Sequence, residues 1–254
     1  MKDYLIDTHA HVDMLEEPLA ETITLMAEHC VKKVVIPAVE VATLDKVIEV
    51  SKSYSDFYAM VGIFPTEAKT YSQDVEEKLI CLTKNPKVKA VGEIGLDYYW
   101  DKSFVELQKE VFVSQIKLAN RFELPIVIHD REAHKDTFDL LKEYNHGSRV
   151  LFHCFSGSVE FMRECVKEGW YIALGGVVTF KNAQKMKDVA CEVPLDKLVL
   201  ETDSPYLTPV PYRGKPNTPA YVSFVAQEIA KLRQMPIEEL VSITTENAER
   251  FFDI

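Results

Sequence analysis

The sequence predicts a (β/α)8 barrel, an α/β fold in which eight parallel strands alternate with helices. Three observations support this prediction. Apolar runs of strand length alternate along the chain with longer amphipathic runs. The short runs are apolar almost throughout, as expected for parallel strands that are covered on both faces. A chain of 254 residues is also a common size for a single barrel.

The first half of the chain accounts for four strands and four helices. An apolar strand begins at Leu5, and the next strands are expected at residues 33–37, 57–61 and 88–93. Helices are expected at residues 17–30, 42–54, 73–83 and 103–122. Ser103 is expected to cap the last of these helices, because Glu106 completes a capping-box pattern.

The second half repeats the alternation and adds a long loop. Strands are expected at residues 125–129, 149–153, 170–174 and 198–201, with helices ending near 144 and at 159–168 and 182–191. A proline-rich loop covers 205–219, and two helices follow it. No linker divides the chain, so we expect one domain over residues 1–254. An open doubly wound sheet would need a glycine-rich turn after the first strand, which the sequence lacks.

The overall composition limits the choice of function and compartment. A net charge of −11 argues against attraction of the whole surface to nucleic acid, although a local phosphate site stays possible. The five cysteines form no Cys-x-x-Cys pair, which favours reduced thiols. The N-terminal residues lack a signal-peptide pattern, and no apolar stretch is long enough for a bilayer. We therefore expect a cytoplasmic protein with no membrane association.

Polar side chains gather where the predicted strands end. His9 and His11 are two residues apart, so on a strand they point to the same face, with Asp7 below them. A strand-end histidine alone often bonds only a neighbouring loop. In a barrel, however, all strand C-termini share one face, where active sites lie. The further candidates at these ends are Glu93, His129, His153 and Asp203.

These residue types suit a centre with two divalent ions, such as Mg, Mn or Zn. One ion is expected on His9, His11 and Asp203, and the other on His129 and His153, with Glu93 bridging. Two such ions can activate a water and clamp the attacking and leaving oxygens. Asp203 and Glu93 are the expected catalytic carboxylates, and Asp203 would orient the water and accept its proton. Asp7 and the deeper Glu201 are expected to support the ligands.

The motifs resemble the TatD family of metal-dependent deoxyribonucleases, within the amidohydrolase-like TIM barrels. The resemblance rests on residues 7–13, 91–99, 129–133, 153–157, 200–207 and 211–217. It implies a metal-dependent hydrolase whose two ions are carried by the six ligands named above. It also implies cleavage of DNA phosphodiester bonds from an end, in the 3′–5′ direction, by a two-metal-activated water. DNA would be the substrate partner, and no obligate protein partner is implied.

One departure from the family pattern concerns substrate preference. Where the family often has Gly-x-His-Pro, this chain has Phe64 between Ile63 and Pro65. An imidazole that could contact phosphate is thus replaced by an apolar ring. The acidic charge and Phe64 motivate a second hypothesis, the hydrolysis of a small ester, lactone, amide or aminoacyl-nucleotide bond by the same site. A third is a metal-stabilised module that binds DNA without cleaving it.

Substrate contacts are expected in the loops around this face. Arg131 follows a predicted ligand and can meet a phosphate, or it can pair with a neighbouring acid. Arg213 and Asn217 lie in the loop after the last strand, a frequent phosphate position in barrels. Tyr98 and the two aromatic residues that follow it can stack on bases, or they can pack inside their loop.

Overall fold

The strands follow one another in the sheet as they do in the sequence. A computed structural model describes residues 2–254. The sheet order is β1 to β8, and the recorded pairs β1–β2, β3–β4, β4–β5, β5–β6 and β7–β8 are all parallel. This topology confirms the predicted fold class of alternating strands and helices. The strands are β1 (Leu5–Asp7), β2 (Val31–Pro37), β3 (Phe57–Val61), β4 (Val88–Asp97), β5 (Ile126–Arg131), β6 (Val150–Phe152), β7 (Tyr171–Leu174) and β8 (Leu198–Leu200).

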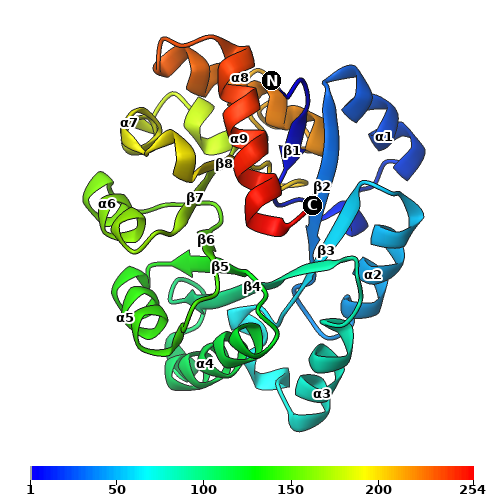
Figure 1. Cartoon of the computed structure of the whole chain (residues 1–254), viewed down its shortest axis with the longest axis vertical. Helices are drawn as coiled ribbons and strands as arrows, with labels where there is room; N and C mark the ends of the chain where they lie inside the picture. Colours follow the sequence, from blue (N-terminus) through cyan, green and yellow to red (C-terminus); the bar gives the residue numbers. More distant parts are fainter. Residues whose placement is uncertain (1) are drawn as a thin grey trace. The chain divides into compact units, whose positions relative to one another are not determined.

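A helix follows each strand, and a last helix ends the chain (Figure 1). The strand cores are buried, so their apolar runs form the interior that the sequence predicts. The helices are α1 (Leu19–Glu28), α2 (Leu44–Ser53), α3 (Gln73–Leu82), α4 (Val105–Arg121), α5 (His134–Tyr144), α6 (Val159–Lys167), α7 (Gln184–Glu192), α8 (Val222–Leu232) and α9 (Ile237–Phe252).

The end of β4 and the start of α4 differ from the boundaries predicted from the sequence. β4 continues past Glu93 to Asp97, which extends the strand by a second acidic residue. The predicted cap at Ser103 is wrong. Ser103 lies inside a 3-10 turn (Lys102–Phe104), where its backbone N–H donates to the Asp101 side chain at 2.8 Å. Asp101 therefore caps that turn, and α4 begins only at Val105, without a side-chain cap.

The chain divides into two compact units. The first combines Met1–Ile36 with Gly157–Ile254, and the second is Pro37–Ser156. In the first unit β8 lies beside β1, since Thr8 N donates to Leu200 O at 3.1 Å and Asp203 N to His9 O at 2.9 Å. Contact between the first and last strands is what a (β/α)8 barrel requires. Helices α8 and α9 pack against β1 in the same unit (Figure 1).

In the second unit, β4 and β5 come unusually close at one residue. Gly95 has φ +146°, and a Cβ at this position would lie 2.0 Å from His129 O. Only glycine fits such a conformation and such an approach. The register pairs Gly95 with His129, so Glu93 and His129 reach the same end of the two strands.

None of the helices within residues 2–254 combines the length and the apolarity needed to cross a bilayer. No disulfide joins the five cysteines in the described part of the chain. The expectation of one domain over residues 1–254 stays a prediction.

Candidate metal centre

Three predicted ligands converge in the second unit. Glu93 Oε2 lies 3.1 Å from His153 Nε2 and 3.5 Å from His129 Nδ1. Glu93 and His153 are buried, and the His129 side chain is 16% exposed. Ligand atoms of the three residues all lie within 4.8 Å of one another. This cluster brings two imidazole nitrogens and a carboxylate to one point, which is a donor set that suits a divalent transition metal.

Asp97 holds the His129 ring from its other side. His129 Nε2 lies 2.9 Å from Asp97 Oδ2, so the nitrogen that faces Glu93 is Nδ1. Burial by itself would lower the pKa of His129, but hydrogen bonds to Asp97 and Glu93 outweigh it and raise that pKa. Such a carboxylate behind a histidine fixes ring orientation and tautomer in metal sites. Sequence reasoning missed Asp97, although it shares a strand face with Glu93 four residues earlier.

The first unit contains the other three predicted ligands. Asp203 Oδ1 lies 3.4 Å from His11 Nε2 and 3.9 Å from His9 Nε2. Both histidines are buried, and their ring centroids lie 5.2 Å apart. Asp203 has φ 57°, in the left-handed region that aspartate tolerates better than most residues. This conformation turns the chain three residues after β8 and brings the carboxylate to the histidine pair.

Asp7, two residues before His9, holds the backbone of this cluster through hydrogen bonds. Its carboxylate accepts hydrogen bonds from Thr202 N at 2.9 Å, Thr202 Oγ1 at 2.5 Å and His9 N at 3.2 Å. Complete burial raises the pKa of Asp7 well above its usual value. Asp7 thus joins β1 to the segment after β8, on which Asp203 lies. Glu201 is fully buried, one residue beyond β8.

Comparison with known proteins identifies the family. The sequence model of the family described as TatD related DNase matches residues 6–253. The chain belongs to the TatD family. The protein described as uncharacterized metal-dependent hydrolase YabD, from Bacillus subtilis (strain 168), is 44% identical to this chain. The match covers 98% of this chain and 99% of the length of YabD. YcfH of Escherichia coli (strain K12), with the same description, is 35% identical over 99% and 96%.

A solved structure from the TatD family has the same fold. YJJV, a TatD homolog from Escherichia coli K12, superimposes with a TM-score of 0.93 at 32% identity and covers 98% of both chains. A TatD family hydrolase from Entamoeba histolytica, at 22% identity, has a TM-score of 0.88 and supports the fold alone. The chain is a metal-dependent hydrolase of the TatD family with the (β/α)8 barrel fold, and its His and Glu clusters fit metal ions.

The predicted substrate contacts have different environments. The Arg131 guanidinium lies 3.7 Å above the Tyr99 ring. Tyr98 instead donates its hydroxyl to Asp136 on α5, at 2.7 Å. Burial, followed by the Asp136 carboxylate, raises the pKa of Tyr98. The Tyr98 hydroxyl therefore ties the loop after β4 to α5 in the described structure.

Hydrogen bonds from a buried side chain hold the loop after β8 in place. Asn217 is fully buried, and its amide donates to Thr202 O at 3.0 Å and Tyr206 O at 2.6 Å. Arg213 is exposed, with its guanidinium 3.8 Å above the Phe180 ring. Asn217 therefore holds the loop against the segment that carries Asp203, while Arg213 keeps a surface position.

Phe64 contacts a metal-ligand candidate of the second unit directly. Its ring packs edge-to-face on His129, with the centroids 4.4 Å apart. The residue that replaces the usual family histidine thus covers one face of a metal-ligand candidate. It supplies an apolar wall where a histidine would supply a hydrogen-bonding group.

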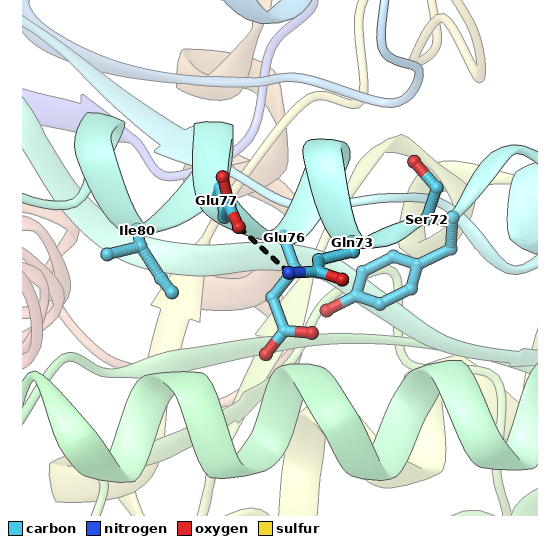
Figure 2. Close-up of a pocket in the computed structure, with 6 residues that line it drawn as sticks. Ser72, Gln73, Glu76, Glu77 and Ile80 are labelled. Atoms are coloured by element: carbon cyan, nitrogen blue, oxygen red, sulfur yellow. Dashed lines mark hydrogen bonds between the residues drawn. The ribbon is translucent and has the colours of Figure 1, made fainter.

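A separate hollow lies beside α3. Figure 2 shows Gln73 and Glu76 at this hollow, with Gln73 Nε2 donating to Glu77 Oε1 at 3.1 Å. None of the predicted site residues lines it. Two neighbouring carboxylates on a helix surface do not by themselves make a binding site, and we assign the hollow no function.

Proposed function

We propose that the protein is a deoxyribonuclease that hydrolyses phosphodiester bonds from an end of DNA, in the 3′–5′ direction. The observation that carries the proposal is the convergence of His129 and His153 on Glu93 in a chain of the TatD related DNase family. Imidazole and carboxylate donors at one point suit metal-assisted hydrolysis of a phosphate ester. DNA would then be the substrate, with no obligate protein partner, and the cytoplasm would be the compartment.

We further propose that the two clusters act together as one centre for two divalent ions, Mg, Mn or Zn. In a (β/α)8 barrel, residues at the C-terminal ends of different strands face a common site. His9, His11 and Asp203 would hold one ion, and His129 and His153 the other, with Glu93 between them. When bound, the ions would lower the pKa of a water and balance negative charge on the phosphate.

Side chains of the protein would accept the proton, bind the substrate phosphate and orient a ligand ring. Asp203, 16% exposed, would accept the proton from the attacking water. Arg131 would hold a phosphate of the substrate through its guanidinium N–H groups. Asp97 would keep the Nδ1 of His129 turned toward Glu93.

End-labelled DNA provides the test. Single- and double-stranded DNA, labelled at one end or the other, is incubated with protein loaded with Mg, Mn or Zn. We expect successive shortening from the 3′ end and its loss in Glu93→Ala. Glu77→Ala, a change on the surface of α3, is the matched control and should keep the activity. DNA that stays intact with every metal would contradict the proposal.

Phe64 favours a second candidate, hydrolysis of a small ester, lactone, amide or aminoacyl-nucleotide bond. Its apolar ring against His129 suits an uncharged group better than a second phosphate. The same donors can assist attack of water on a carbonyl carbon. This candidate predicts turnover of small esters that His129→Ala abolishes, together with intact DNA.

A further inference from the structure

A groove of about 360 Å³ lies between α1 and the segment that leads into α8, within the first unit. Its volume falls in the range of small-molecule sites. Helix α1 packs against the 3-10 turn Pro219–Tyr221, so the two walls of the groove belong to one packed region. Among the described residues, the lining of the groove includes three carboxylates and no basic side chain.

The three carboxylates belong to Glu17, Glu21 and Glu28, all of them exposed. Glu21 and Glu28 are seven residues apart on α1, so they share one face of the helix and lie about 10 Å apart along its axis. Within residues 2–254, none of the three has a basic nitrogen within 4.0 Å. Glu28 is also the last residue of α1, where a negative charge is unfavourable for the helix dipole. These charges therefore favour a cationic ligand.

Two threonine hydroxyls in the groove have no hydrogen-bond partner among residues 2–254. Thr22, on α1, is only 4% exposed, and its unpaired Oγ1 is not fully covered, so this hydroxyl opens to the groove. Thr218, on the opposite wall, is 8% exposed, and its Oγ1 is fully covered. Buried hydroxyls in native proteins normally have a partner. The unpaired hydroxyl of Thr22 indicates a ligand that carries hydrogen-bond donors such as N–H groups.

Apolar surface lies between the charged groups. Leu25 is four residues after Glu21 and three before Glu28, so it lies between them on the same face of α1. Tyr221 lines the groove opposite α1. Methylene groups can pack on Leu25, and an ammonium group can lie over the Tyr221 ring. The lining thus suits a ligand in which positive charges alternate with short apolar segments.

We propose that this groove binds a linear aliphatic polyamine. Its ammonium groups pair with Glu21 and Glu28 and donate to Thr22, while the methylene groups between them cover Leu25. A single metal ion does not fit, because no described set of three ligand atoms within 4.8 Å of one another includes these glutamates. An extended cation reaches carboxylates that one ion cannot. The site goes beyond the proposed nuclease function and shares no residue with the proposed metal centre.

Titration calorimetry of spermidine into the whole protein tests the site. Magnesium in the buffer loads the metal centre and competes for any site that suits a divalent ion. We expect one spermidine to bind per chain, with an affinity that falls as the salt concentration rises. Butylamine, which has one ammonium group, should bind about 5- to 25-fold more weakly.

Glutamine substitutions locate the bound cation. Replacing Glu17, Glu21 and Glu28 together by glutamine should weaken spermidine binding about 10- to 100-fold. A matched control set removes the same number of exposed carboxylates from helices of the second unit and should keep the affinity within about twofold. The control substitutions are Glu49→Gln, Glu110→Gln and Glu143→Gln.

Thr22→Val tests the hydroxyl without changing the charge of the groove. We expect about 2- to 10-fold weaker spermidine binding. The thermal midpoint without spermidine should stay the same, because the hydroxyl has no protein partner to lose among the described residues. An affinity equal to that of wild-type protein would contradict the contact with Thr22.

Three results would overturn the proposal. The first is the absence of spermidine binding in magnesium buffer. The second is equal affinity of the groove variant and the control set, or of spermidine and butylamine. The third is binding of a tetralysine peptide by protein that does not bind spermidine, since the groove would then suit a basic protein segment.

Discussion

The Asp97 carboxylate and the Glu93 carboxylate lie against opposite nitrogens of one ring. Asp97 Oδ2 is 2.9 Å from His129 Nε2, and Glu93 Oε2 is 3.5 Å from His129 Nδ1. Both carboxylates come from β4, four residues apart, while the histidine comes from β5. Asp97 therefore sets which nitrogen of His129 is offered to a metal ion, although it is not a ligand in the proposed centre.

Asp97→Asn should weaken metal binding while preserving the fold. An amide can still accept the backbone hydrogen bonds of the loop, but it lacks the charge that orients the His129 ring. We expect metal affinity to fall about 10- to 100-fold, as measured by competition with a chelator. Asp136→Asn, a change at a carboxylate that bonds Tyr98 and Lys109, should leave the affinity within about twofold. Equal affinity of Asp97→Asn and wild-type protein would refute this role.

Phe64→His should improve the binding of phosphate-bearing substrates. The new imidazole would stand beside His129 and offer an N–H group where the structure has an apolar ring. A typical hydrogen bond contributes about 1–1.4 kcal/mol net, so we expect KM to fall about 5- to 10-fold with a smaller change in kcat. Phe64→Leu, which adds no donor, is the control. The role of Phe64 is wrong if Phe64→His and Phe64→Leu give the same KM.

Asp7→Ala should destabilise the protein strongly. The substitution leaves three hydrogen-bond donors without their acceptor in a fully buried place: Thr202 N, Thr202 Oγ1 and His9 N. We expect the free energy of unfolding in urea to fall by about 2–4 kcal/mol. Asp7→Asn keeps one acceptor oxygen and should lose less. A loss below about 0.5 kcal/mol for Asp7→Ala would show that these bonds do little for stability.

Glu249 should make stability depend on pH in the acid range. Burial would raise its pKa, but hydrogen bonds from Tyr4, Lys2 and Lys33 outweigh burial and lower that pKa from 4.5 to about 2. Because the folded-state pKa is depressed, the stabilisation is fully present above pH 4.5 and is lost as pH falls toward 2. Glu249→Gln should cost about 1–3 kcal/mol at neutral pH.

Urea unfolding of metal-free protein across this pH range measures the effect. The difference between wild-type protein and Glu249→Gln should shrink as pH falls, because protonation removes the same charge from the wild-type side chain. Glu239→Gln changes an exposed carboxylate on the same helix and should show a smaller, flatter effect. A difference for Glu249→Gln that does not change with pH would contradict this assignment.

The candidate ligands at strand ends could be named from the sequence because their signals are local. His9 and His11 follow an apolar strand, and Glu93 lies within another, so covalent order and the period of two place them at strand ends. Asp97 was harder to find because its partner, His129, is 32 residues away and meets it only through the register of β4 and β5. The predicted Ser103 cap is wrong for a local reason. The Asp101 side chain accepts a hydrogen bond from the backbone N–H of Ser103, which Glu106 would accept in a capping box.

The sequence by itself determined the alternation of strands and helices, the six candidate ligands and the family, because all of these lie in residue order and spacing. Tertiary structure decided which surfaces remain accessible. Asn217 and Trp100 both lie in loops that follow strands, but in the folded protein Asn217 is fully buried and Trp100 is exposed to solvent. Exposure depends on what distant segments cover, and hydrogen bonds between strands depend on their register. Neither property is contained in the local pattern of residues.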